Sequence, residues 1–353
     1  MTGLGLDRIA AAVVAAMLDA SVRTAAVVGL AGLTLVLWRR PSTRTRSLVW
    51  TLVLYAALAM PCLERALPAL RVAVPATSAL TTLAPAGGSS IAIRNQAAAW
   101  LGEAPMFEAA STTATVPMRP HVTWLDGVLV LYATGLAWLL GRMTLGWATA
   151  RRLRLTGTPI DDPAVLRTVA AHASRLGLAA PPRLIEHRRL FVPVTMGFGR
   201  AVIGLPADWR EWADDTLAAV VIHEVSHVAR RDTLTLWLSQ AYRAGSWFNP
   251  VSWWLHGRLS DLAEEASDEA ALEAGISRTT YAETLLTFFK RLPGSGGRAA
   301  WTVAMARPDD VGAERRIDRV LAWDRRASPA KTRRLQLTVV IMAAVLVGAA
   351  ASV

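Results

Sequence analysis

The chain has 353 residues, of which 53% are hydrophobic and only 18% are charged, and its mean hydropathy is positive at +0.33. This composition argues against an ordinary soluble protein and indicates a membrane protein with an attached soluble part. The net charge of +11 does not indicate direct nucleic-acid binding, because the arginines flank apolar stretches as cytoplasmic anchors do. The single cysteine, Cys62, excludes an internal disulfide and a cysteine-based zinc site.

Two apolar runs near the N-terminus predict transmembrane helices at about residues 20–38 and 47–63, because each is close to the length that crosses a bilayer. A short basic loop that starts at Arg39 joins them. Cytoplasmic loops are rich in arginine and lysine, so we expect this loop inside and the N-terminus outside. Residues 1–65 are thus a pair of transmembrane helices. Residues 66–122 are rich in Ala, Thr, Ser, Pro and Gly with few basic residues, which predicts a weakly structured extracytoplasmic loop.

The rest of the chain is predicted to cross the membrane twice more. Residues 123–142 form a third span that is led in by Trp124 and closed by Arg142, and it returns the chain to the cytoplasm. Residues 150–334 are then a cytoplasmic domain, and residues 335–353 are a fourth apolar run just long enough to span. We therefore expect a multi-pass protein of the bacterial inner membrane, with the lipid bilayer as a partner.

The cytoplasmic domain is expected to begin with a helix and a small antiparallel sheet. Residues 164–176 have a helical pattern, and strand-like runs follow at 183–186, 190–196 and 201–205, with glycines at the turns. An extended peptide can pair with the edge of such a sheet, and a sheet that only packs on the next helix fits the pattern equally well. The predicted fold class is therefore mainly α and membrane-bound, with a cytoplasmic α+β domain.

A metal-binding motif follows in this domain, His223-Glu224-Val225-Ser226-His227. Two histidines four residues apart lie one turn from each other on the same helix face, so both imidazoles can reach one metal ion. Glu224 is then placed to take a proton from a water molecule activated by the metal. The alternative, a chance match in an ordinary helix, is uncommon in a chain with six histidines.

Catalytic zinc usually has three protein ligands, so a third ligand is expected downstream on another element. A long helix predicted to follow Asn249 offers two acidic pairs with four-residue spacing, Glu264 with Asp268 and Glu265 with Glu269. One member of a pair can bind the metal while the other orients a ligand histidine. Spacing alone does not choose between the pairs. We expect the pair that does not serve the metal to lie on a solvated face, and assign Glu265 and Glu269 to it.

Several other segments accompany the two histidines at characteristic positions. They are Phe191–Phe198, Ala201–Pro206, Arg230–Asp232, Phe248–Trp254, Glu264–Ala270 and Arg315–Ile317. In this combination the chain resembles the BlaR/MecR-type integral-membrane zinc metallopeptidases, from its first predicted span to its fourth. The β-lactam-binding sensor domain of the named members does not follow Val353 here, so β-lactam sensing is not among the expectations.

The resemblance implies a gluzincin-type zinc metalloprotease domain. By position, His223, His227 and Glu264 match the zinc ligands and Glu224 the catalytic base. Asp268 matches the acid that supports a ligand histidine. Ser267 stands where many relatives have a cysteine, a change that should not alter metal binding.

The function implied is that of a zinc endopeptidase of signal transduction that cleaves a cytoplasmic regulatory protein, with a winged-helix transcriptional repressor as the expected target. A homodimer is compatible with this interpretation. Two alternatives stay open: a quality-control or processing protease of the HtpX/CAAX kind, and a signalling scaffold that no longer cuts. An oxyanion-stabilising residue is also expected, and the candidates are Tyr242, His256 and Arg258, each with a structural role as the alternative.

Overall fold

The structure is a computed structural model that describes residues 3–38, 41–66, 124–291 and 310–324. These residues all belong to one unit, Met1–Pro68 with Thr123–Ser352. The predicted extracytoplasmic loop, from residue 67 on, and the predicted fourth span lie outside the described residues.

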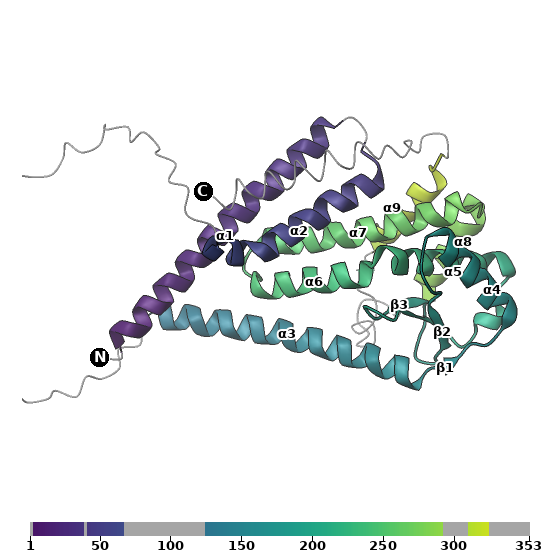
Figure 1. The fold of residues 1–353 in the computed structure, drawn as a ribbon, viewed down its shortest axis with the longest axis horizontal. Helices are drawn as coiled ribbons and strands as arrows, with labels where there is room; N and C mark the ends of the chain where they lie inside the picture. Colours follow the sequence, from purple (N-terminus) through teal and green to yellow (C-terminus); the bar gives the residue numbers. More distant parts are fainter. Residues whose placement is uncertain (1–2, 39–40, 67–123, 292–309, 325–353) are drawn as a thin grey trace, which may run out of the picture. The chain divides into compact units, whose positions relative to one another are not determined.

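The described residues are mainly helical, with a four-stranded sheet (Figure 1). The helices are α1 (Gly3–Leu37), α2 (Thr43–Ala66), α3 (Trp124–Thr156), α4 (Pro163–Arg175), α5 (Asp214–Arg230), α6 (Asp232–Gly245), α7 (Pro250–Glu273), α8 (Arg278–Arg291) and α9 (Asp310–Leu321), together with a 3-10 turn, η2 (Trp209–Glu211). The strands are β1 (Thr158–Pro159), β2 (Arg183–Glu186), β3 (Val194–Met196) and β4 (Val202–Leu205).

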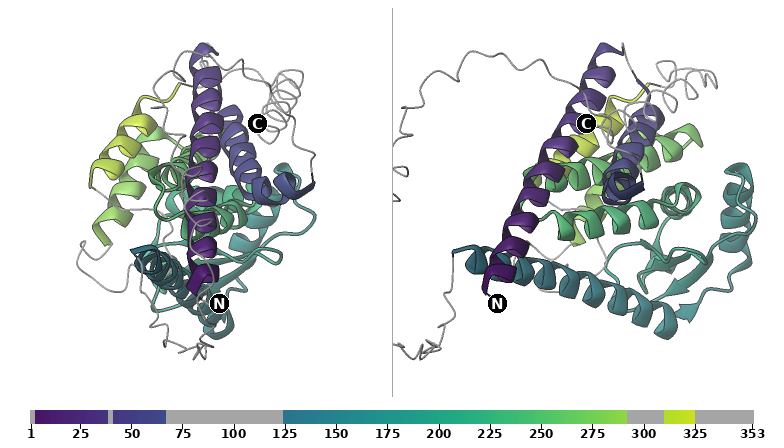
Figure 2. Two further views of the ribbon diagram at one scale, coloured as in Figure 1. Left: turned by 90° about the vertical axis from the view of Figure 1, so that its left-hand side faces the viewer. Right: turned by 60° about the vertical axis from the view of Figure 1, so that its left-hand side comes forward.

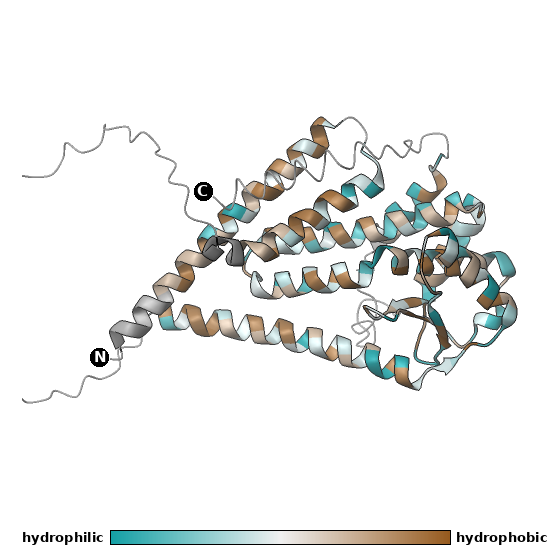
Figure 3. Ribbon diagram, in the orientation of Figure 1, coloured by the Kyte–Doolittle hydropathy of each residue, from teal (hydrophilic) through white to brown (hydrophobic). Residues whose placement is uncertain are grey.

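Two of the described helices are long and apolar enough to cross a membrane, Ala11–Leu37 of α1 and Trp124–Thr156 of α3. Figure 3 shows hydrophobic residues along much of both. The protein covers little of them, since only 17% of the most apolar window of α1 and none of that of α3 is buried. Trp138 of α3, for example, is 68% exposed. Both helices extend beyond the predicted spans, and α3 continues to Thr156 as one helix.

The second predicted span corresponds to α2, which is not one of the two helices that meet this test. Its first turns contain Arg44 and Arg46, which lower its mean hydropathy. α2 also differs from α3 in being largely covered by protein, with Trp50 and Leu54 buried. It packs beside α1, as the two views of Figure 2 show, and against α7.

The sheet is mixed and not antiparallel, so that part of the prediction is wrong. Its order is β1-β2-β4-β3, and β2 pairs with β4 in parallel while the other two pairings are antiparallel. The reason is that every residue of β4 is buried, which favours a central position in the sheet. β4 therefore lies between β2 and β3, and β3 and β1 are the two edge strands. The predicted strand at 190–196 is shorter than expected, because only its last three residues pair.

The described residues form four buried hydrophobic clusters, and two of them show how the helices are arranged. One joins the sheet to α4 and α5 through residues such as Ile203 and Val225. The other joins α1 and α2 to α6 and α7, with Val27, Leu54 and Leu255 among its buried members. The helix that follows the metal motif therefore belongs to the same core as the N-terminal helices.

Candidate metal centre

The two motif histidines lie on α5, whose local sequence explains its start and its end. Asp214 and Asp215 occupy the first turn, where carboxylates interact favourably with the helix dipole. The helix ends at Arg231, which adopts the left-handed conformation with φ of 57°. That conformation costs a non-glycine residue about 1–2 kcal/mol. It turns the chain directly into α6, so that Asp232, the first residue of α6, returns to the side chain of His227.

Three side chains converge at one point. The Nε2 atoms of His223 and His227 lie 3.2 Å apart. Of the two carboxylate oxygens of Glu264, on α7, Oε2 lies 3.6 Å from Nε2 of His223 and Oε1 lies 3.6 Å from Nε2 of His227. One ligand atom from each residue lies within 4.8 Å of the others. Nitrogen ligands about 2.0–2.1 Å from a tetrahedral zinc are about 3.3 Å apart. The donor types and their separations therefore fit a zinc ion.

The outer ring nitrogen of His227 has a carboxylate partner. Asp232 accepts a hydrogen bond from Nδ1 at 2.7 Å and is only 8% exposed. Arg230 binds the same carboxylate at 2.6 Å, which neutralises its charge. With the Nδ1 proton held in this way, Nε2 is left as the nitrogen that can bind a metal.

The outer nitrogen of His223 is held by a tyrosine and an aspartate. The hydroxyl of Tyr281, on α8, lies 2.9 Å from Nδ1 and donates to Asp268 at 2.6 Å. Asp268 itself lies 3.4 Å from Nδ1. Burial and the neighbouring charge of Asp268 raise the pKa of Tyr281 well above its usual value, so the phenol stays protonated. The predicted role of Asp268 thus agrees with its position, and Tyr281 shares it.

A buried arginine from α9 balances the carboxylates. Arg316 binds Glu264 and Asp268, at 2.6 Å in each case, and one of its nitrogens lies 3.4 Å from Nε2 of His223. Burial raises the pKa of Glu264, but the charge of Arg316 and the two histidines lower it well below the usual range. Glu264 is therefore anionic, which is the form that binds a metal.

The acidic surroundings also change the titration of His223. Burial lowers the pKa of this imidazole, but hydrogen bonds to Asp268 and Glu264 raise it more, to about 9. Without a metal, this site therefore holds a proton at neutral pH. The same negative surroundings favour a bound cation, and metal binding has to release that proton.

The predicted base, Glu224, is buried next to the histidines and is held by the sheet. Its Oε2 accepts a hydrogen bond from the hydroxyl of Thr195 at 2.7 Å. Thr195 lies in the middle of β3, an edge strand. One carboxylate oxygen of Glu224 is thus fixed by Thr195, and the other is not used by this bond.

The second acidic pair of α7 is not on a solvated face, and this expectation is wrong. Glu265 is 7% exposed and accepts hydrogen bonds from Thr43, at 2.9 Å, and from Arg46. Glu269 accepts from Thr43 at 2.6 Å. The reason is that the beginning of α2 covers this face of α7, which spacing along one helix cannot reveal.

The three candidates for oxyanion stabilisation make contacts elsewhere. The hydroxyl of Tyr242 lies 3.0 Å from that of Thr24 in α1, and Nδ1 of His256 lies 2.7 Å from the hydroxyl of Ser239. Arg258 is near Arg46, Glu265 and Asp261. None of these contacts involves the three converging residues, and all of them agree with the structural alternative.

The sequence analysis assigns no role to four residues that the structure places at this centre: Thr195, Asp232, Tyr281 and Arg316. Two of them could have been found from the sequence. Asp232 follows the second histidine by only five residues. Arg316 could have been expected because several buried carboxylates require a buried cation. Thr195 and Tyr281 carry no such signal, because only the tertiary structure brings them to the motif.

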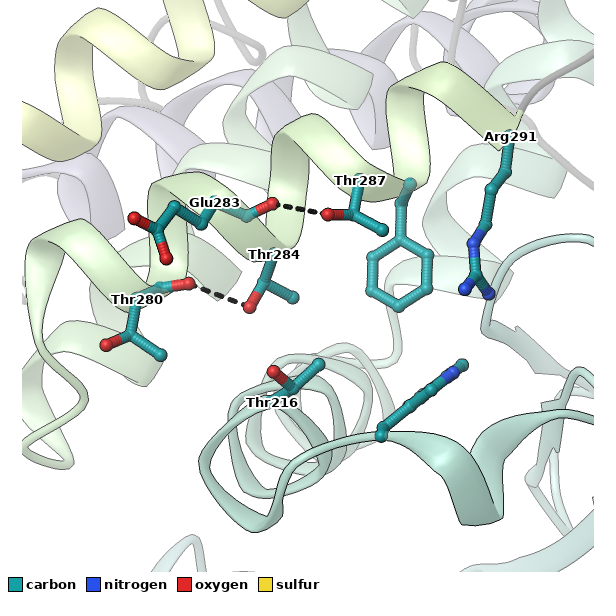
Figure 4. A pocket seen from close by; sticks show the side chains of 8 residues that line it. Thr216, Thr280, Glu283, Thr284, Thr287 and Arg291 are labelled. Carbon is teal, nitrogen blue, oxygen red and sulfur yellow. Dashed lines mark hydrogen bonds between the residues drawn. The ribbon is translucent and has the colours of Figure 1, made fainter.

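A separate pocket of about 270 Å³ lies between α8 and the region that leads into α5 (Figure 4). It is lined by Trp212, Thr216, Thr280, Glu283, Thr284, Thr287, Phe288 and Arg291. The hydroxyls of Thr284 and Thr287 bond to backbone carbonyls of α8 at 2.8 Å, and Arg291 pairs with Asp208 at 2.6 Å. Because none of the three converging residues lines it, we assign it no part in the metal centre.

Comparison with known proteins identifies the family. A family model described as BlaR1 peptidase M56 matches residues 12–320. The regulatory protein BlaR1 of Bacillus licheniformis is 31% identical over 98 residues, a segment that covers 27% of this chain and 16% of that relative. The resemblance predicted from the motifs is therefore confirmed. Because the family model matches most of its length, this chain belongs to the BlaR1 M56 peptidase family.

Proposed function

We propose that this protein is a membrane-embedded zinc endopeptidase of signal transduction that cleaves a cytoplasmic regulatory protein. The observation that carries the proposal is the convergence of His223, His227 and Glu264, with the buried Glu224 adjacent to His223 in the chain. Membership of a peptidase family supports peptide-bond hydrolysis, and the similarity to the regulatory protein BlaR1 supports a role in regulation. The expected substrate is a transcriptional repressor of the winged-helix type.

In the proposed mechanism, the residues of the centre have distinct tasks. A zinc ion bound by His223, His227 and Glu264 supplies a Lewis acid for the scissile carbonyl and lowers the pKa of water toward neutrality. Glu224 takes a proton from the attacking water and passes it to the leaving amine nitrogen. The hydrogen bond from Thr195 orients this carboxylate.

The edge strand β3 supports a mode of substrate binding. One side of β3 pairs with β4, and no strand among the described residues pairs with its other side. We propose that an extended substrate segment adds to this side as a further strand. Thr195, which holds Glu224, is in the middle of that strand, so a peptide paired there would run past the catalytic base.

For the membrane placement, we propose that α1 and α3 cross the bilayer with the N-terminus outside, and that α2 crosses as well. The support is the apolar composition of α1 and α3 and the arginines around residues 39–46, which favour a cytoplasmic position for the connection between α1 and α2. The metal motif follows the basic end of α3 in the chain, which favours the cytoplasmic side for the metal centre.

The test is a substrate trap in native membranes. Glu224→Gln should keep its zinc, retain a bound cytoplasmic regulatory protein that mass spectrometry identifies, and fail to cleave it, whereas the wild type cleaves it. Glu283→Gln, which changes an exposed glutamate of α8, is the control and should cleave normally. A trap that retains damaged membrane proteins would support the quality-control alternative, and cleavage by Glu224→Gln would refute the assigned base.

A further inference from the structure

The turn between α6 and α7, residues 246–249, packs against the middle of a predicted membrane span. The carbonyl of Gly245, at the end of α6, accepts a hydrogen bond from the hydroxyl of Tyr132 in α3 at 3.0 Å. The indole of Trp247 donates to the carbonyl of Tyr132 at 3.3 Å. A Cβ on Gly135 would lie 2.5 Å from the Trp247 ring, so a glycine is required for this close approach. The turn is therefore fitted to α3.

The two helices that flank the turn also share contacts with α1 and α2. Trp254 of α7 packs edge-on against Trp50 of α2, with 4.9 Å between the ring centroids. Tyr242 of α6 contacts Thr24 of α1 through their hydroxyls. Leu236 and Leu255 belong to the same buried cluster as residues of α1 and α2. α6 and the first half of α7 thus pack on helices that we place in the bilayer.

Two independent distances along the helices give the depth of the turn. Glu265 binds Arg46, at the basic end of α2, and Pro250, at the turn, lies fifteen residues before Glu265 in α7, a rise of about 22 Å. Trp124 marks the opposite, extracytoplasmic end of the predicted span. Tyr132, which contacts the turn, lies eight residues after it in α3, a rise of about 12 Å. The hydrocarbon core is about 30 Å thick. Both distances therefore place the turn roughly 20 Å from the Arg46 side, beyond the midplane.

Several backbone groups of the turn are hydrogen-bonded within the protein. The N–H of Asn249 donates to the carbonyl of Ser246 at 2.9 Å. The hydroxyl of Ser252 lies 2.8 Å from the carbonyl of Ser246 and 2.7 Å from that of Asn249. The carbonyl of Trp247 accepts from the indole of Trp253 at 2.7 Å. Internal bonds of this kind are favoured in hydrocarbon, because each unsatisfied backbone group there costs several kcal/mol, whereas in water such a group can bond to solvent.

One charged residue near the turn is accommodated in the same way. Arg243 is half-buried, and its guanidinium lies 4.6 Å from the centre of the Trp253 ring. Charged groups within a bilayer face protein and pair with other groups, and a cation over an indole face is one such pairing. Arg243 is therefore compatible with a position inside the membrane.

We propose that α6 and the first half of α7 form a re-entrant hairpin that enters the bilayer from the side of Arg46 and passes its midplane. The exposed faces of Trp253 and Trp254, 45% and 47% exposed in the protein alone, are then covered by lipid acyl chains. This differs from the wholly cytoplasmic placement predicted for residues 150–334. It rests on the proposed membrane placement of α1 and α3, and does not depend on peptidase activity.

The hairpin has a direct structural connection to the metal centre. Its first leg begins at Asp232, which binds His227. Its second leg continues without a break to Glu264, about 21 Å from the turn. A change in the position of the hairpin in the lipid would therefore move both Asp232, which binds His227, and the ligand Glu264.

The experiment measures lipid exposure in the full-length chain reconstituted in nanodiscs. A single cysteine replaces Trp253 in a Cys62→Ala background and carries a nitroxide spin label. Its collision rates with oxygen, which concentrates in lipid, and with a water-soluble nickel chelate are compared by electron paramagnetic resonance. The lipid reference is Trp138→Cys on α3, and the aqueous control is Leu286→Cys on α8, where the native side chain is 43% exposed.

The label at Trp253 should match the one at Trp138, with oxygen collisions exceeding nickel collisions several-fold, and the label at Leu286 should show the reverse. Trp254→Cys provides a second position if loss of the Trp253 hydrogen bond prevents folding. Labels at Trp253 and Trp254 that behave like the one at Leu286, while Trp138 is in lipid, would overturn the hairpin. An aqueous pattern at Trp138 itself would instead refute the membrane placement of α3, and the inference with it. Neither result depends on cleavage.

Discussion

Asp232→Asn should weaken zinc binding although Asp232 does not itself reach the metal. Its carboxylate lies 2.7 Å from Nδ1 of His227 and 2.6 Å from Arg230, and it is almost fully buried. The asparagine keeps the size of the side chain but removes the charge that fixes the Nδ1 proton of His227. Loss of such a partner typically reduces metal affinity about 10–100-fold, which corresponds to about 1.4–2.8 kcal/mol.

The assay is a competition titration of zinc against a chelator of known affinity, with the full-length protein in nanodiscs at pH 7. Asp208→Asn is the matched control, because Asp208 also pairs with an arginine at 2.6 Å but has no contact with either histidine. Its zinc affinity should equal that of the wild type. If Asp232→Asn, folded by circular dichroism, also binds zinc as tightly as the wild type, the role given to Asp232 is incorrect.

Three further predictions concern the base, the contact between α2 and α7, and pH. Thr195→Val should reduce kcat about 10–100-fold, because a hydrogen bond to a charged group contributes about 1.5–3 kcal/mol. Zinc content and KM should hardly change, and Thr195→Ser should restore most of the rate. A full rate in Thr195→Val would argue against the role given to Thr195. Glu265→Gln should lower the free energy of unfolding by about 3 kcal/mol, since it leaves Arg46 without its charge partner. In thermal unfolding, the double variant Arg46→Met with Glu265→Gln should lose less stability than the sum of the losses in the two single variants. Strict additivity would contradict the coupling between the two residues. In the metal-free protein, the pKa of folded His223 is about 9, above the usual value of 6.5 for a histidine. Its contribution to stability is therefore complete below pH 6.5 and is lost as the pH rises through about 9. Zinc affinity should increase over the same window, and a zinc affinity that stays flat from pH 6.5 to 9 would contradict this.

The parts of the site that the sequence predicts are those encoded by spacing within one helix. The four-residue interval places His223 and His227 on one face of α5 whatever surrounds them. The resemblance then selected Glu264 and Asp268 from two equally spaced pairs, and both lie at the histidines. The helix expected at 164–176 and the helix expected after Asn249 also begin within one residue of α4 and α7.

What could not be predicted depends on contacts between elements far apart in the chain. Thr43 and Glu265 are 222 residues apart, so the burial of Glu265 follows from the packing of α2 and not from α7. The parallel pairing of β2 with β4 depends on which strand is buried on both faces, and local alternation does not report this for a four-residue strand. Tyr281 and Arg316 reach the centre from α8 and α9, whose helical patterns indicate only that each has a buried side.

The central claim is that His223, His227 and Glu264 hold one zinc ion, and its most direct test is the zinc content of the purified full-length protein measured by elemental analysis. The wild type and Asp208→Asn should contain close to one zinc per chain after exposure to zinc and removal of the excess. Glu264→Gln should contain almost none, and Glu265→Gln, changed at the neighbouring position, should retain it. A wild type without zinc, or a Glu264→Gln variant that keeps a full equivalent, would contradict the proposed metal centre.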